Sequence, residues 1–264
     1  MRKQPVIYFV AVLVIGLSSR QLLADQIPVR YTEGLLHGFL VLRSQEGEAL
    51  ADGEVEQTAH GNQVTTKLEF HFKDGSLHQE TTVAYQGKTF QLVSDHLIQK
   101  GPSFPHPIDV SITKFNGQVT IHYTDDEGKE KTINDHVTLP PDVANGLTLT
   151  LLPNIRPATQ KTTVSMLATT PKPRLVKLII TPSGEDSFTV GNTKHTAIHY
   201  VIKVDLGGVA GKVAPVVGKQ PADIHVWILS DEAPVFVKME GPLYNEGPVW
   251  RIELASPTWP GESK

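Results

Sequence analysis

Hydrophobic and polar residues alternate along most of the chain between Leu35 and Thr138. A period of two is typical of β-strands that bury one face. Short turn signals interrupt the alternation at Asp74-Gly75, Gln86-Gly87 and Asn116-Gly117. Because local turns join neighbouring strands, this half of the chain is predicted to form an antiparallel meander.

The stretch LEFHFKDGSLHQETTV, residues 68–83, is the clearest hairpin. A two-residue turn at Asp74-Gly75 would pair His71 with His78 and Glu69 with Glu80. These four residues then share one face, and the apolar residues share the other. With the next strand added, the inner face is expected to hold Phe70, Phe72, Leu77, Val83, Phe90 and Leu92.

A second register of this hairpin stays open. If Lys73-Asp74-Gly75 is a three-residue loop with a β-bulge, Phe70 lies opposite His78 and the histidine pair disappears. That register mixes apolar and polar residues on both faces, so the two-residue turn is favoured. The next two hairpins are predicted to pair Val83 with Phe90 and Ile112 with Ile121.

Two segments depart from the alternating pattern. Pro102, Pro105 and Pro107 interrupt regular strand pairing and indicate a corner or an edge crossing. The segment LPPDVANGLTLTLLPNIRP, residues 139–157, is predicted to contain one short buried helix. Asp142 would cap this helix, Leu147 and Leu151 would lie on its apolar face, and Pro153 would end it. The competing alternation of Leu and Thr at 147–151 is typical of a strand.

After Lys161 the strand pattern resumes, giving about thirteen short strands in all. The expected fold is mainly β: a large curved antiparallel meander, or open half-barrel, with one short buried helix. Residues 25–264 form a β-rich domain, which the sequence also allows to be two modules, 25–138 and 161–264, joined by 139–160.

Residues 1–24 have the features of a cleavable signal peptide. Arg2 and Lys3 precede the apolar run from Val6 to Leu17, which is too short to span a bilayer comfortably. Removing these residues leaves 21 basic and 28 acidic residues, a net charge of −7. A negative chain without a basic cluster is not expected to bind nucleic acid. No transmembrane segment is expected after signal cleavage, and a protein partner is not identified.

Cysteine is absent, which excludes disulfides, cysteine nucleophiles and a lipoprotein anchor on cysteine. Secretion without disulfides favours the bacterial periplasm or export. A Gly-x-Ser-x-Gly motif is missing, and Gly207–Lys212 lacks phosphate-loop spacing. A metal site is a weaker hypothesis, formed by His71, His78, Glu69 and Glu80 or by His195 and His199. No cofactor is expected.

Four segments carry a family resemblance: LEFHFKDGSLHQETTV, LVSDHLIQKGPSFPHPIDVSI, LPPDVANGLTLTLLPNI and GGVAGKVAPVVGKQPADIHVWILSDEAPVFVKMEGPLYNEGPVWRIEL. Together they resemble a family of uncharacterised secreted β-rich bacterial proteins. The order of elements is also similar, at the level of fold alone, to the half-barrels of periplasmic lipoprotein carriers and receptors. Those carriers bind acyl chains, and the resemblance supplies no catalytic residues.

These observations favour a non-enzymatic periplasmic carrier or binding protein for a hydrophobic ligand such as a lipid or acyl chain. The residues expected to line its site are Phe70, Phe72, Leu77, Phe90, Leu92, Leu147 and Leu151. Two alternatives stay open: a metal-dependent or hydrolytic enzyme that uses the histidine-rich strands, and an envelope module that binds a protein at a sheet edge.

Overall fold

The computed structural model describes residues 25–125, 127–169, 172–190, 192–207, 220–230 and 233–255, and the backbone of 257–258. The predicted signal peptide, 1–24, and most of the glycine-rich stretch, 208–219, lie outside the described residues. Among the described residues, no helix is long and apolar enough to cross a membrane.

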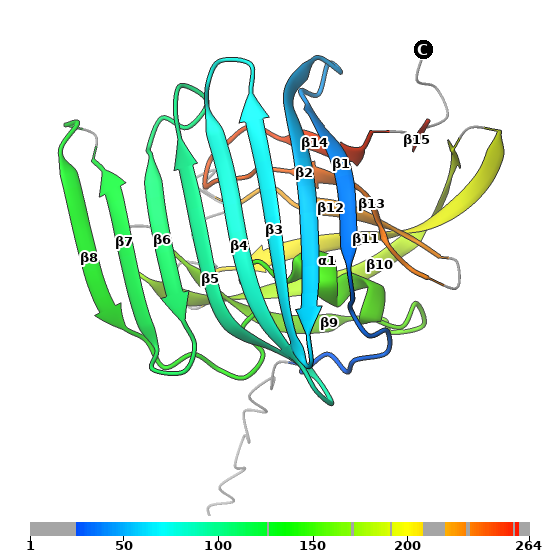
Figure 1. Ribbon diagram of the computed structural model, residues 1–264, viewed down its shortest axis with the longest axis horizontal. Helices are drawn as coiled ribbons and strands as arrows, with labels where there is room; N and C mark the ends of the chain where they lie inside the picture. Colours follow the sequence, from blue (N-terminus) through cyan, green and yellow to red (C-terminus); the bar gives the residue numbers. More distant parts are fainter. Residues whose placement is uncertain are drawn as a thin grey trace, which may run out of the picture.

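Fifteen strands pair into one antiparallel sheet (Figure 1), which confirms the mainly β fold. The first eight follow one another in sequence: β1 (Leu36–Arg43), β2 (Ala49–His60), β3 (Gln63–Phe72), β4 (Leu77–Gln86), β5 (Phe90–Lys100), β6 (Ile108–Thr113), β7 (Gln118–Thr124) and β8 (Glu130–His136). The others are β9 (Thr162–Ala168), β10 (Arg174–Val190), β11 (Thr193–Asp205), β12 (Ile224–Leu229), β13 (Phe236–Gly241), β14 (Trp250–Leu254) and β15 (Pro257–Thr258).

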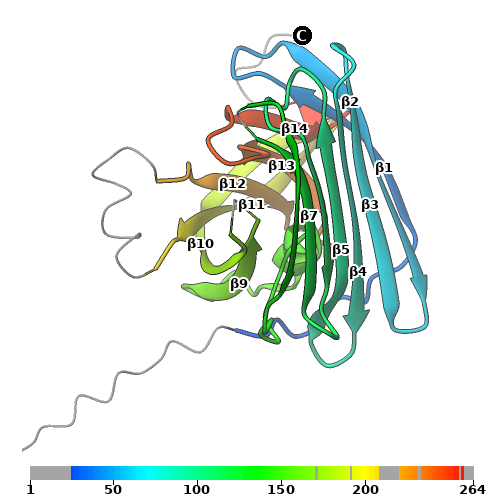
Figure 2. The ribbon, with the colours of Figure 1, turned by 90° about the vertical axis from the view of Figure 1, so that its left-hand side faces the viewer.

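The sheet folds over into two facing layers (Figure 2). The front layer is the meander β1–β8, and the back layer is formed by β9–β14. The layers are continuous because β14 pairs with β1, with Leu254 opposite Leu40. The hydrogen-bonded path runs from β15 to β8 without joining its ends, so the sheet is an open, barrel-like structure.

The β3–β4 hairpin uses the three-residue loop. Phe70 lies opposite His78 and His71 opposite Leu77. The Phe72 amide donates to the Ser76 carbonyl at 2.9 Å, and Gly75 has a φ of 86°. The favoured two-residue turn was therefore wrong, and the three-residue alternative is confirmed. Since side chains alternate, His71 and His78 lie on opposite faces of the sheet.

The two following hairpins also differ from the predicted registers. Ala84 lies opposite Leu92, with an irregularity next to Val83, and Ile112 lies opposite Val119. Both connecting loops are longer than two residues, which shifts each pairing. Leu77 and Val83, both expected inside, alternate onto the outer face because of the three-residue β3–β4 loop.

The inner face of β4 is mainly polar. Four of its inward side chains form what we call the polar column: His78, Glu80, Thr82 and Gln86. Only Ala84 interrupts the polar column with an apolar side chain. The burial pattern thus puts polar residues of this central strand on the side where the sequence predicted apolar ones.

Residues 139–155, the central segment, cross between the two layers (Figure 2). The segment contains α1 (Thr148–Leu151) and a single turn of 3-10 helix (Leu152–Asn154), so a short helix is confirmed. Its N-cap is Leu147 rather than Asp142, whose carboxylate instead accepts a hydrogen bond from Ser165 at 2.5 Å. Leu147 and Leu151 are buried in the hydrophobic core.

Candidate functional site

Four aromatic rings meet at the end of the interior where β3 finishes, which we call the upper end because β3 ends at the top of Figure 1. This aromatic cluster consists of Phe72, Phe104, Tyr244 and Trp250. The Phe72 ring lies 5.3 Å from Phe104 and 5.4 Å from Trp250, measured between centroids. Phe104 also lies 5.6 Å from Tyr244. Edge-to-face contacts of this kind join the β3 end, the β5–β6 loop and the β13–β14 loop.

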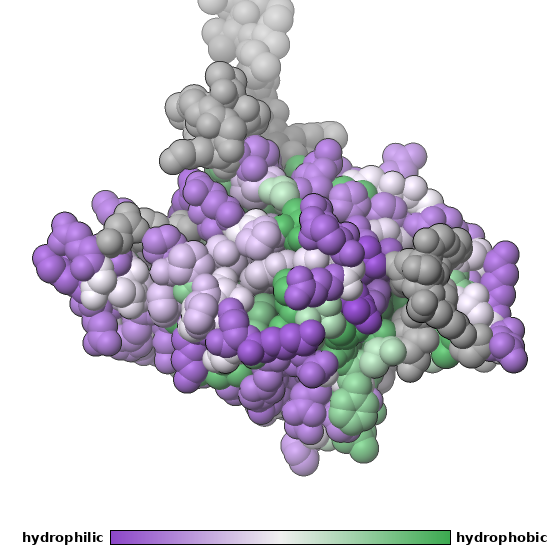
Figure 3. Space-filling view, turned by 90° about the horizontal axis from the view of Figure 1, so that it is seen from above, coloured by the Kyte–Doolittle hydropathy of each residue, from purple (hydrophilic) through white to green (hydrophobic). Residues whose placement is uncertain are grey.

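A cavity of about 280 Å³ adjoins this cluster through Trp250. Its walls are Gln45, Glu240, Val249, Trp250 and Arg251. Seen from above, the molecule shows green hydrophobic surface in the middle of this face, with purple hydrophilic surface around it (Figure 3). The aromatic cluster is therefore next to an opening of the protein surface.

Apolar side chains near this end are incompletely covered. In the front layer these are Leu97, Ile108 and Tyr123; in the back layer they are Met239, Leu243 and Tyr244. All six pack against the main core, yet each keeps accessible surface. Apolar surface that stays exposed can mark a binding site when it is contiguous.

His78, the uppermost member of the polar column, is buried beside the aromatic cluster. Its Nδ1 lies 3.0 Å from Nε2 of Gln99, and that amide nitrogen also donates to the Leu243 carbonyl at 2.8 Å. Burial lowers the pKa of His78 to about 4, because a charged imidazole would lose its hydration. His78 is thus neutral near pH 7.

Two carboxyl groups lie lower on the same inner face. Burial, followed by the charge of the neighbouring Asp95, raises the pKa of Glu80 to about 8. Burial also raises the pKa of Asp95 to about 6, although a hydrogen bond from Thr82 at 2.8 Å opposes the shift. Near pH 7 the pair therefore keeps a proton on Glu80.

The central segment covers these carboxyl groups with backbone. Gly146 has a φ of 64°, and a Cβ there would lie 1.8 Å from Oγ1 of Thr82 and 2.6 Å from Oδ1 of Asp95. Only glycine fits this approach. On its other side, the segment is fastened to β9 by Asn145, which exchanges hydrogen bonds of 2.8 and 3.0 Å with Leu167.

The lowest part of the polar column is paired with residues near the N-terminus of the described chain. Gln86 accepts from the Glu33 amide at 2.8 Å and donates to the Glu33 carbonyl at 3.0 Å. Gln57 donates to the Glu33 carboxylate at 2.8 Å, while burial raises the pKa of that carboxyl. The lower end of the interior is therefore closed by hydrogen bonds between these side chains and Glu33.

The residues expected to line a ligand site are mostly core residues. Six of the seven are buried in the main hydrophobic cluster: Phe70, Phe72, Phe90, Leu92, Leu147 and Leu151. Leu77 is the exception, because the observed register turns it to the outer face. Phe72 alone of these belongs to the aromatic cluster. A ligand role for the set stays a prediction.

The structure does not bring the four predicted metal ligands together on one face. His71 and Glu69 lie outside, where Nε2 of His71 is 2.5 Å from Glu69 and Lys67 also binds that carboxylate. His78 and Glu80 lie inside. The expected pairings His71–His78 and Glu69–Glu80 are wrong because the loop has three residues rather than two.

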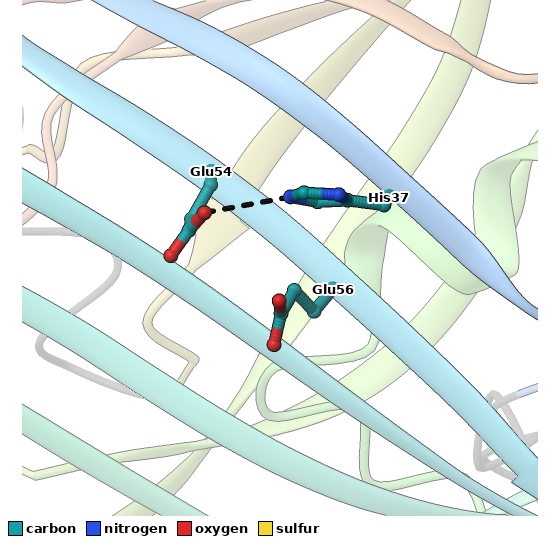
Figure 4. A group of neighbouring side chains, drawn as sticks. All are labelled: His37, Glu54 and Glu56. Atoms are coloured by element: carbon teal, nitrogen blue, oxygen red, sulfur yellow. Dashed lines mark hydrogen bonds and ion pairs between the residues drawn. The ribbon is translucent and has the colours of Figure 1, made fainter.

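Imidazole and carboxylate ligands meet elsewhere, on the outer face of β1 and β2 (Figure 4). The ligand atoms of His37, Glu54 and Glu56 lie within 4.8 Å of one another, and His37 is 3.4 Å from Glu54. All three are open to water, and Lys67 stands opposite Glu56. Sequence reasoning missed this group because the pairing of β1, which carries His37, with β2, which carries both glutamates, was not worked out from the sequence.

His195 and His199, the other predicted pair, make separate contacts. His195 stacks on Phe188, whereas His199 stacks on Trp227 with ring centroids 4.3 Å apart. Nε2 of His199 also lies 2.9 Å from Nδ1 of His225. Burial, followed by the charge of His225, lowers the pKa of His199. These contacts form a partly covered aromatic layer on the outside of the back sheet.

Comparisons with known proteins support the fold alone. No protein-family model matches the chain, and no curated protein is similar to it in sequence. Among solved structures, a β-barrel-like protein of a domain of unknown function, DUF1849, from Brucella abortus is similar. The two chains share 9% identity with a TM-score of 0.50, over 90% of this chain and 100% of that chain. The similarity agrees with a β-rich, barrel-like architecture.

Proposed function

We propose that this protein binds a hydrophobic ligand, such as a lipid or acyl chain, in the upper interior between its two layers. The observation that carries the proposal is the group of incompletely covered inward apolar side chains around the aromatic cluster. Ligand sites are usually concave, mainly apolar and lined by a few polar groups. The adjoining cavity of about 280 Å³ offers the entrance.

The rest of the interior serves as scaffold under this proposal. The central segment is held by paired hydrogen bonds and by the close approach of Gly146, so it has a fixed place. The lower end is closed by Glu33, Gln57 and Gln86. The expected lining residues Phe90, Leu92, Leu147 and Leu151 then support the site from below, while Phe72 contacts the ligand.

A carrier acting in the bacterial periplasm is the setting that fits this role. The N-terminal residues have the composition of a signal peptide, and the order of elements expected from the sequence resembles that of lipoprotein-carrier half-barrels. The mass of the protein isolated from a periplasmic extract tests this setting. A chain that starts near residue 25 supports it; an uncleaved chain in the cytoplasm contradicts it.

Binding is tested with the delipidated protein and the fluorescent fatty acid cis-parinaric acid. Tyr244→Ser removes an aromatic wall of the site and should weaken binding roughly tenfold. Phe115→Ser is the matched control, because Phe115 is 99% exposed in the β6–β7 turn and should leave binding unchanged. If the folded wild-type protein binds no fatty acid, or if the two variants behave alike, the proposal is wrong.

A further inference from the structure

The hydrogen bonds of Gln99 determine where the His78 ring carries its proton. The Leu243 carbonyl can only accept, so the group of Gln99 that faces it is the NH₂. The same NH₂ lies 3.0 Å from Nδ1 of His78 and gives its second proton there. Nδ1 is therefore an acceptor, and the proton of the neutral ring is on Nε2.

The Nε2–H group of His78 is buried and has no hydrogen-bond partner among the residues that the structure describes. An unpaired buried donor is energetically costly, so folded proteins contain few of them. The ring proton cannot move from Nε2 to Nδ1, because Nδ1 already accepts a hydrogen bond from Gln99. The structure thus holds a fixed N–H donor beside the apolar rings of Phe70 and Phe104.

Two aromatic side chains lie beside the His78 ring: Phe70 on β3, 6.0 Å away between centroids, and Phe104 on a loop. The ring of Phe104 lies 6.3 Å from the His78 ring and belongs to residues 101–107, which connect β5 to β6. The loop is fastened by Ser103, whose amide donates to Ser76 at 2.8 Å and whose hydroxyl donates to Asp74 at 2.7 Å. Phe104 also contacts Trp250, the residue shared by the aromatic cluster and the cavity.

These contacts link the cavity to His78 through the rings of Trp250 and Phe104. Of these three residues, Phe104 alone lies on a loop. Trp250 begins β14, and His78 lies on β4. A side chain that occupies a site until a ligand arrives is a common way for a protein to keep an apolar pocket closed.

We propose that the ligand carries a hydrogen-bond acceptor at the end of its chain, the carbonyl or carboxylate oxygen of an acyl group, which binds Nε2–H of His78 after Phe104 moves aside. This inference rests on the proposed function and names the head group that it selects. A cationic amine head would find no acceptor, because Nδ1 is already paired. A pure hydrocarbon would leave the donor unpaired.

Competition against cis-parinaric acid tests the head-group preference. The competitors are palmitic acid, methyl palmitate, hexadecylamine and hexadecane, which share similar chains but differ at the end. We expect the acid and the ester to compete roughly tenfold better than the amine and the hydrocarbon. An acid that competes while the ester does not assigns the site to free fatty acids; equal competition assigns it to acyl groups in general.

Two variants tie the preference to the donor. His78→Phe should abolish the difference between palmitic acid and hexadecane, whereas His71→Phe, on the outer face, should keep it. A preference that survives in His78→Phe overturns the inference. Chains that bind wild-type protein with no head preference also overturn it, and leave the proposed function intact. If none of the four competitors binds, the proposed function itself is wrong.

NMR of the histidine side-chain nitrogens gives a second measurement that needs no variant. In the ligand-free protein His78 should be neutral at pH 7, with its proton on Nε2. Addition of palmitic acid should shift this Nε2–H proton, because a hydrogen bond replaces an apolar neighbour. An unmoved resonance in the fatty-acid complex, or a proton found on Nδ1, contradicts the inference even if His78→Phe does not fold.

Discussion

The polar column is closed in different ways at its middle and at its upper end. At the middle, the backbone of Gly146 lies against Thr82 and Asp95, whose hydrogen bond to each other is complete. At the upper end, the loop-borne ring of Phe104 packs beside His78, whose Nε2–H has no partner among the described residues. A backbone cover cannot move without refolding its segment, but a side-chain cover can. The middle of β4 is therefore structurally closed, whereas its upper end is the candidate binding site.

The largest expected effect comes from breaking the middle seal. In Gly146→Ala the new Cβ meets Thr82 and Asp95, and the residue has to adopt a φ of 64°. Strain and overpacking together should lower the free energy of unfolding by about 3–5 kcal/mol. Gly128→Ala is the control, because Gly128 has a φ of 76° but no atom near its Cβ position. Urea denaturation of both variants measures the difference; equal losses would show that no seal exists.

An intermediate effect is expected from the carboxyl pair as the pH rises. The folded pKa of Glu80, about 8, lies above its ordinary value of 4.5, so the folded protein holds a proton that the unfolded chain has lost. Stability should therefore fall as the pH rises from about 4.5 to about 8, by at most about 1.4 kcal/mol per pH unit. Glu80→Gln should flatten this decline. Glu130→Gln, on the exposed edge strand β8, should leave it unchanged.

His78 should act in the opposite direction over the acid part of this range and below it. Its folded pKa of about 4 lies below the ordinary value of 6.5, so the unfolded chain takes up a proton first. Stability from this residue is lost as the pH falls from 6.5 towards 4, with a slope of at most about 1.4 kcal/mol per pH unit. His78→Phe should remove that slope. Thermal melting at several pH values measures this slope. If His78→Phe leaves the loss of stability between pH 6.5 and 4 unchanged, His78 is in contact with water rather than buried.

The smallest effect should come from loosening the loop that carries Phe104. Ser103→Ala removes its hydrogen bond to the exposed Asp74, which is worth roughly 0.5–1 kcal/mol. The amides of the loop should exchange hydrogen faster, while those around Gly146 keep their protection. Ser111→Ala, on the outer face of β6, is the control. If the middle segment also loosens, the two covers are not independent.

The sequence predicted the fold class well, because alternation and turn signals persist through most strands. It also placed Phe70, Phe72, Phe90, Leu92, Leu147 and Leu151 in the interior. It failed on β4, where the apolar Leu77 and Val83 lie outside and polar residues lie inside. A single extra loop residue reverses every side chain of a strand, so the error in the turn caused the error in the face.

The aromatic cluster could not be predicted by local patterns. Phe104 comes from a proline-rich loop, and Tyr244 and Trp250 come from a part of the chain about 140 residues later. Their meeting depends on the folding-over of the sheet, which alternation does not encode. The buried state of His78 was hidden for a related reason, since its partners Gln99 and Leu243 lie on other strands and loops.

The pairing of β14 with β1 has a consequence for how the chain acquires its structure. Leu40 on β1 pairs with Leu254 on β14, so one edge of β1 stays unpaired until nearly the whole chain is available. Contacts between residues so far apart in sequence slow the search for the native state, and a free strand edge attracts other chains. We therefore expect refolding to be slow and concentration-dependent, with the meander β1–β8 forming before the last strand completes the sheet.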